Sequence, residues 1–169
     1  MSPSTGSGRA TWMVLVLAAL AACGGDNQDP PAADELFARV KAANYTNWRR
    51  APTIPERQPS YTAHAGAVDV YVNAVVAGAI DDPTKMVPRA TQKPAFPKGS
   101  IVVKEGYSGS KLAVIAVMER RSDADDGWFF AEYNGDGKAL FSGRPAICLN
   151  CHGVRADFSD SLFTLEQPR

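Results

Sequence analysis

The sequence predicts an α+β fold, made mainly of an antiparallel β-sheet with a few helices. Apolar residues in the N-terminal half recur at helical spacings of three and four, whereas the C-terminal half contains three short runs rich in β-branched and aromatic residues. Short, turn-like segments connect these runs, which favours antiparallel pairing. The chain beyond the N-terminal segments, roughly 135 residues, is long enough for one domain with its own core.

The first residues are typical of an export signal. Arg9 is the only charged residue before an apolar run from Trp12 to Ala22, which is too short to span a membrane. The following stretch, Leu20-Ala21-Ala22-Cys23-Gly24, resembles the lipobox of bacterial lipoproteins. We therefore expect residues 1–22 to be a lipoprotein signal peptide and Cys23 to be lipidated. An ordinary signal peptide or an uncleaved anchor is the alternative.

Residues 23–33 are predicted to form a flexible tether, because they are mostly small, polar or proline, and residues 34–169 are predicted to form the folded domain. No Asp directly follows Cys23, which favours the outer membrane, facing the periplasm, with a lipid anchor as the only membrane contact. Removing residues 1–22 leaves 17 basic and 18 acidic residues, a formal net charge of −1. This balance gives no reason to expect nucleic-acid binding.

The N-terminal half of the domain predicts two helices. Asp34 can cap the first, which runs to about Asn44 with one apolar stripe. The second is predicted from Ala65 to Ile80, where apolar residues recur at spacings of three and four, and Asp81-Asp82-Pro83 ends it. The proline-rich residues 45–63 and 83–98 are predicted to be irregular.

Three strands are predicted next, at Ser100–Glu105, Lys111–Met118 and Gly127–Tyr133. Residues 106–110, 122–127 and 134–137 carry the Gly, Ser, Asn and Asp residues that are typical of turns and loops. We therefore expect the three strands to be neighbours in one antiparallel sheet.

The sequence Cys148-Leu149-Asn150-Cys151-His152 has the spacing required for covalent attachment of one haem c. The two thiols can add to porphyrin vinyl groups, and His152 is then placed to be the proximal iron ligand. A Cys-x-x-Cys pair can also be a disulfide, a redox motif or half of a zinc site. Outside this motif, however, the chain offers only Cys23 and His64 as further cysteine or histidine ligands for zinc.

A sixth iron ligand, if there is one, must come from upstream of the motif. Residues 153–169 contain no Met, His, Lys or Cys, so Met86, Met118, His64 and several lysines are the candidates. Four-helix cytochromes c′ also have a C-terminal motif, but the three strands immediately upstream argue against a helix bundle.

An ordered set of segments resembles the cytochrome P460 family over roughly residues 34 to 166. The set comprises His64-Ala65-Gly66, Tyr71-Val72-Asn73, the stretch from Phe96 to Glu105, Ala116-Val117-Met118, Trp128-Phe129-Phe130, the haem motif and Leu162-Phe163-Thr164. The resemblance implies a largely antiparallel β fold, often a homodimer, holding a five-coordinate haem c with an open distal side. It also implies either oxidation of hydroxylamine or, as in relatives of the cytochrome c′ type, binding of nitric oxide and similar ligands.

In the enzymes of this family a lysine is bonded to a haem meso carbon, and the resemblance assigns that position to Lys104. With a strand period of two, Val102 and Lys104 share one face. If this face lines the haem, desolvation would favour the neutral, nucleophilic amine. A solvated lysine on an edge strand is the alternative.

Two departures from the family bear on catalysis. The enzymes use a distal carboxylate as proton acceptor, expected just after the haem-binding histidine, and here Asp157 or Glu132 would have to serve. The family also tends to have an arginine before its Tyr-x-Asn segment, where this chain has Asp69-Val70.

Phe129 and Phe130 are candidates for packing against the haem, with ordinary core positions as the alternative. His64 is either a distal group or a surface residue. Two functions therefore remain open. The first is a hydroxylamine-oxidising enzyme that passes electrons to a periplasmic acceptor. The second is a non-catalytic cytochrome that binds nitric oxide or transfers electrons.

Overall fold

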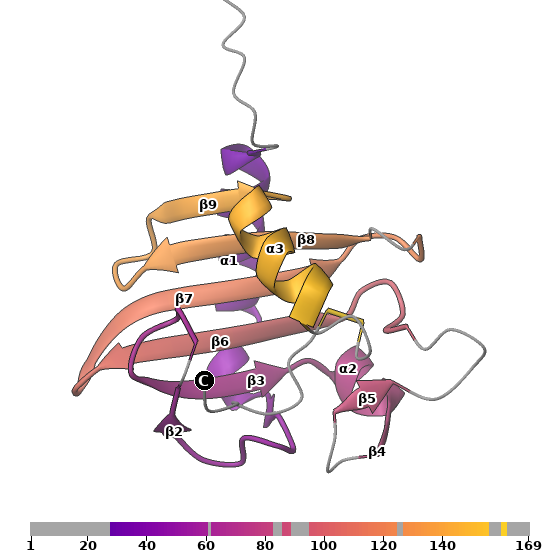
Figure 1. Cartoon of the computed structure of the whole chain (residues 1–169), viewed down its shortest axis with the longest axis horizontal. Coiled ribbons are helices and arrows are strands. Elements are labelled where there is room, and N and C mark those ends of the chain that lie inside the picture. Colours follow the sequence, from indigo (N-terminus) through magenta and orange to yellow (C-terminus); the bar gives the residue numbers. More distant parts are fainter. Residues whose placement is uncertain are drawn as a thin grey trace, which may run out of the picture.

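The computed structural model describes residues 28–60, 62–82, 86–88, 95–124, 127–155 and 160–161 (Figure 1). The expected signal peptide, Cys23, most of the tether and Asp157 lie outside the described residues. Within the described residues, no helix is long and apolar enough to cross a membrane.

One seven-stranded sheet dominates the molecule, and all its pairings are antiparallel. Its strand order is β1-β3-β6-β7-β8-β9, with β2 also pairing with β3. The strands are β1 (Arg49–Arg50), β2 (Gln58–Pro59), β3 (Ala67–Val72), β6 (Ile101–Ser108), β7 (Lys111–Arg120), β8 (Trp128–Asn134) and β9 (Ala139–Gly143). A small second sheet pairs β4 (Ile80–Asp82) with β5 (Val87–Pro88). The helices are α1 (Pro30–Ala42), α2 (Ala74–Ala79), α3 (Ala146–Arg155) and the short 3₁₀ helix η1 (Tyr45–Asn47).

The predicted α+β class and the three predicted strands are confirmed. β6, β7 and β8 correspond to them and are consecutive neighbours in the sheet. Strand β9 was not predicted; it is short, has only moderate β-propensity, and pairs with β8 after the predicted turn.

The first helix is confirmed but begins at Pro30 rather than after Asp34. Asp29 is its N-cap, and its side chain accepts a hydrogen bond from the Ala32 amide. Pro30 and Pro31 fit the first helical turn, where an N–H has no intrahelical partner. The last residues of the expected tether are therefore helical, and Gln28 contacts Ser142 of β9 through a hydrogen bond from the Ser142 amide.

The prediction of a single helix over residues 65–80 is wrong. Residues 67–72 form strand β3, and only Ala74–Ala79 are helical, with Asn73 as the N-cap of α2. The apolar residues at 67–72 fit a period of two as well as helical spacings. In the structure, Val68, Val70 and Val72 are buried on one face of the sheet, and Tyr71 packs on the other. The β-branched content decided the outcome, since these side chains pack well on a pleated surface.

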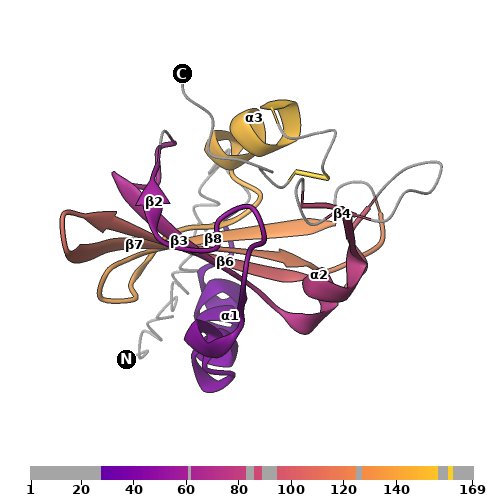
Figure 2. The same ribbon diagram turned by 90° about the horizontal axis from the view of Figure 1, so that it is seen from below.

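The sheet separates two apolar cores. Helix α1 covers one face and α3 lies over the other, as Figure 2 shows. On the α1 side, Leu36 and Val40 pack against sheet residues such as Val103, Val117 and Phe129. On the α3 side, Val102, Met118 and Phe130 contribute to a second core, against which Cys148 and Leu149 pack.

A polar network fixes the loop segment 45–60 to the edge of the sheet. Asp69, which is only 1 % exposed, forms ion pairs with Arg50 and Arg57. The two arginines supply the hydrogen bonds that hold the pKa of Asp69 below its ordinary value of 3.8, even though burial alone would raise it. The resemblance to the P460 family implies an arginine just before the Tyr-x-Asn segment. This chain has Asp69 there, and its carboxylate has a structural role.

We expect Asp69→Asn to lower the free energy of unfolding by ~1–3 kcal/mol at neutral pH, because it removes charge-assisted hydrogen bonds from a buried site. Since the folded-state pKa is depressed, this contribution is present above pH 3.8 and is lost as the pH falls toward the lower folded-state value. Urea unfolding of both proteins at pH 7 and below pH 3.8 measures this. Asp136→Asn, at an exposed turn, is the matched control. If the difference in unfolding free energy between wild-type protein and Asp69→Asn is the same at pH 7 and at acidic pH, the role of the Asp69 charge is contradicted.

Candidate functional site

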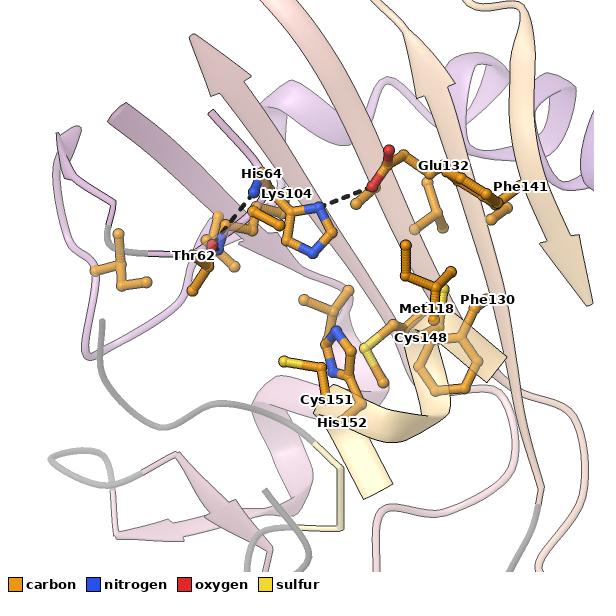
Figure 3. A pocket seen from close by; sticks show the side chains of 18 of the residues that line it. Thr62, His64, Lys104, Met118, Phe130, Glu132, Phe141, Cys148, Cys151 and His152 are labelled. Carbon is orange, nitrogen blue, oxygen red and sulfur yellow. Dashed lines mark hydrogen bonds and ion pairs between the residues drawn. The ribbon is translucent and has the colours of Figure 1, made fainter. Parts of the chain in front are cut away.

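Helix α3 presents the Cys-x-x-Cys-His motif to a cavity. Positions 148, 151 and 152 are three and four residues apart, so they share one helical face. All three side chains line a cavity of about 330 Å³ between α3 and the sheet (Figure 3). This volume is within the range of ~300–1,000 Å³ that is typical of small-molecule sites.

Two rows of residues across the sheet form the floor of this cavity. In one row the strand registers align Val70, Lys104, Ala116, Glu132 and Phe141, and in the next they align Val102, Met118 and Phe130. All of these side chains line the cavity. The small Ala116 separates Lys104 from Glu132, so the backbone positions of these two residues are two strand spacings, roughly 10 Å, apart in the sheet. The remaining lining residues are Ile54, Thr62, Ala63, His64, Met86, Val117, Ala131 and Ile147.

His152 is held in one orientation by its backbone partner. Its Nδ1 lies 2.8 Å from the carbonyl oxygen of Ser161. A carbonyl oxygen only accepts, so Nδ1–H donates and Nε2 keeps the lone pair that binds a metal. Burial lowers the pKa of His152 to about 4, which keeps the imidazole neutral.

The Ser161 carbonyl is itself positioned by a buried ion pair. Asp160 accepts hydrogen bonds from the Phe96 amide at 2.8 Å and from Arg120 at 3.2 Å. The side chain of Arg120 is only 1 % exposed. Asp160 and Ser161 both have positive φ, 50° and 68°, a conformation that needs support from surrounding contacts. We infer that Arg120 and Asp160 hold the turn that orients His152.

The structure brings some of the expected site residues together and separates one. Lys104 lines the cavity, where its Nζ donates to the hydroxyl of Thr62 at 3.0 Å. Phe130 also lines it, with its ring centre 5.3 Å from that of His152. Phe129, in contrast, is a correction to the sequence analysis. It lies on the α1 face, in the opposite core, with the Arg121 guanidinium 3.4 Å from its ring centre. Successive strand residues point to opposite faces, so only one of the two phenylalanines can reach the cavity.

Glu132 and His64 form a second polar pair in the cavity. Glu132 Oε2 lies 2.8 Å from His64 Nδ1, and the two side chains are 22 % and 20 % exposed. From the sequence, Glu132 was expected only as a substitute for a carboxylate after the motif, and His64 as either a distal group or a surface residue. Their pairing depends on a contact between a loop and β8 that no sequence spacing reveals. The roles of Asp160, Ser161 and Thr62 were missed for the same reason.

The chemistry of the lining fits a covalently bound porphyrin better than a redox dithiol or a bare metal ion. Burial, followed by the nearby Glu132 and Cys151, raises the pKa of Cys148 to about 11, whereas reactive redox cysteines have lowered pKa values. Among the described residues, no cluster of three or more His, Cys, Asp or Glu is arranged to hold a metal ion. An apolar floor, two adjacent thiols and a neutral, oriented imidazole are what a haem c requires.

Comparison with known proteins agrees with this geometry. No curated protein matches the chain. The family described as cytochrome P460 matches residues 42–164, a range that includes β3, β6, β7, β8, β9 and all of α3. The match therefore covers the sheet, the floor of the cavity and the haem motif, and the chain belongs to the cytochrome P460 family.

Proposed function

We propose that this protein is a periplasm-facing cytochrome with one haem c, bound through thioether bonds to Cys148 and Cys151 and ligated by His152. The observation that carries the proposal is the convergence of both thiols and a pre-oriented histidine on one apolar cavity. Each thiol S–H adds across one vinyl C=C bond, so attachment consumes no oxidant. When bound, the haem supplies an iron that binds small nitrogen compounds and exchanges electrons.

We further propose that the cavity oxidises hydroxylamine. The reaction takes electrons and protons from the substrate together, so a base must lie near the iron. Glu132 is the carboxylate that the described residues place in the cavity, and we assign it the role of proton acceptor in preference to Asp157. The electrons leave to a periplasmic electron acceptor. Val102, Met118 and Phe130 exclude water from the apolar part of the cavity.

Lys104 is our candidate for a covalent bond to a haem meso carbon. It occupies the cavity floor in the same row as Glu132, on the same face as Val102, so its side chain borders the space that we assign to the haem, and its amine donates to Thr62 of the same lining. Forming this bond replaces a meso C–H with C–N, and we propose a peroxide as the two-electron oxidant.

A non-catalytic role, in nitric oxide binding or electron transfer, is the second candidate function. It is favoured by His64, whose ring faces His152 across the cavity. For either function we propose attachment to the outer membrane through a lipid on Cys23, supported by the lipobox-like sequence around it.

The haem proposal predicts that protein matured in a periplasm with an active cytochrome c maturation system gains the mass of one haem that survives denaturation. The double variant Cys148→Ala/Cys151→Ala should lose this covalent mass, because both thioether donors are gone. Intact-protein mass spectrometry measures it. Wild-type protein without covalent haem would refute the proposal.

The cross-link proposal predicts that, after proteolysis, the peptide containing Lys104 is joined to the haem peptide that contains Cys148 and Cys151. Lys104→Arg should retain the thioether-bound haem but lose this connection, because the two cysteines are unaffected. Peptide mass spectrometry distinguishes the two. Recovery of a free, unmodified Lys104 peptide from fully matured wild-type protein would show that the cross-link does not form.

The assignment of Glu132 predicts that Glu132→Gln lowers the rate of hydroxylamine oxidation by about 100-fold or more, since an amide cannot accept the proton. Haem content should be unchanged. Asp157→Asn is the matched variant, because the sequence offers both carboxylates, and we expect it to keep the wild-type rate. Steady-state kinetics with an artificial electron acceptor measures both. Loss of the rate in Asp157→Asn alone would reverse the assignment.

A further inference from the structure

The two histidines of the chain face each other across the cavity. The sequence has 2 His, and both line this one cavity. Their ring centres are 6.3 Å apart, with the ring planes at 52° to one another. An imidazole nitrogen lies ~2 Å from the metal that it binds, so two imidazoles on opposite sides of one metal have ring centres roughly 6 Å apart. The observed separation therefore matches the one expected for two histidines on opposite sides of one metal atom.

His64 presents one ring nitrogen to the cavity and the other to a carboxylate. Its Nδ1 lies 2.8 Å from a Glu132 oxygen, a distance that allows an ion pair, although the contact lacks the geometry of a hydrogen bond. With Glu132 on the Nδ1 side of the ring, Nε2 is the nitrogen available to a metal. Figure 3 shows the second ring nitrogen of His64 directed into the cavity, toward His152.

The backbone that carries His64 is fixed against the sheet. The Gly66 amide donates to the Tyr107 carbonyl at 3.0 Å, and the Ser60 amide donates to the Gly66 carbonyl at 2.9 Å. Gly106 of β6 allows a close approach, because a Cβ atom at that position would lie 2.3 Å from the His64 carbonyl oxygen. The position of His64 is therefore built into the sheet, although the residue lies in a loop.

From these observations we infer that His64 is the sixth ligand of the haem iron, bound through Nε2 on the side opposite His152. The inference rests on the proposed haem, and it differs from the open distal side that the family resemblance implies. The resting iron is six-coordinate, and a small ligand binds by displacing His64. Once displaced, His64 and Glu132 lie beside the incoming ligand as a paired base.

Other residues of the cavity compete for this assignment. Met86 and Met118 line the cavity and carry sulfur atoms that can bind haem iron. The Lys104 amine donates to Thr62. Of these groups, only His64 places a ring opposite His152 at the separation expected for two imidazoles on one metal, and this geometry decides in its favour.

The test is the spin state of the ferric haem, measured by absorption and electron paramagnetic resonance spectroscopy. Wild-type protein should be low-spin, because two imidazoles provide a strong axial field. His64→Ala should be high-spin and should return to low-spin when free imidazole is added. Met118→Leu, a substitution of similar volume, should stay low-spin. A high-spin wild type, or a low-spin His64→Ala without added imidazole, would overturn the inference.

Ligand-binding kinetics provide a second readout. In wild-type protein the rate of cyanide binding to ferric haem should reach a plateau at the rate of His64 dissociation, whereas in His64→Ala it should rise in proportion to the cyanide concentration. If His64 occupies the iron nine-tenths of the time, the variant should bind cyanide about tenfold more tightly. A wild-type rate that rises linearly, with an affinity equal to that of the variant, would contradict displacement.

The two proposals fail in different ways. Covalent haem, quantified by mass spectrometry in every variant, reports on the proposed function. Absence of covalent haem from wild-type protein refutes the proposed function and this inference with it. A full haem content with a high-spin spectrum refutes only the role of His64.

Discussion

The alternation of side chains across β6, β7 and β8 is the constraint on which the rest of the structure depends. It divides neighbouring residues between two cores, so that Val103 packs beneath α1 while Val102 and Lys104 line the cavity beneath α3. A register shift of one residue would exchange the two faces and send Lys104 and Glu132 into the core against α1. Antiparallel pairing thus gives the cavity both its apolar floor and its row of charged groups.

Orientation of the histidines is the second requirement, and contacts from outside α3 supply it. Arg120 and Asp160 hold the turn whose Ser161 carbonyl fixes His152, while Glu132 on β8 lies 2.8 Å from Nδ1 of His64. Both arrangements leave one nitrogen of the ring for a metal. The sheet is therefore more than a scaffold for the motif, since Arg120 of β7 supports the turn that orients His152 and Glu132 of β8 lies beside His64.

Sequence reasoning predicted the local features of this site and missed those that depend on distant contacts. The motif at 148–152 and the strand period at Lys104 predicted one shared site for Cys148, Cys151, His152 and Lys104, and the structure brings all four to the lining of one cavity, because helical and strand periodicities are local. The spacing of apolar residues over 65–80 fits both a helix and a strand, and tertiary packing makes residues 67–72 a strand. Strand alternation alone puts Phe129 and Phe130 on opposite faces, but only the tertiary packing shows that Phe130 is the one that faces the cavity. The partnership of His64 with Glu132 joins a loop to a strand 68 positions away and has no signature in the sequence.

The crystal structure of the haem-loaded protein would test the central claim most directly. The account predicts a haem in the cavity beneath α3, joined to Cys148 and Cys151, with its iron bound by Nε2 of His152 on one side and Nε2 of His64 on the other. A haem lying elsewhere, or an iron whose protein ligand is not His152, would contradict it.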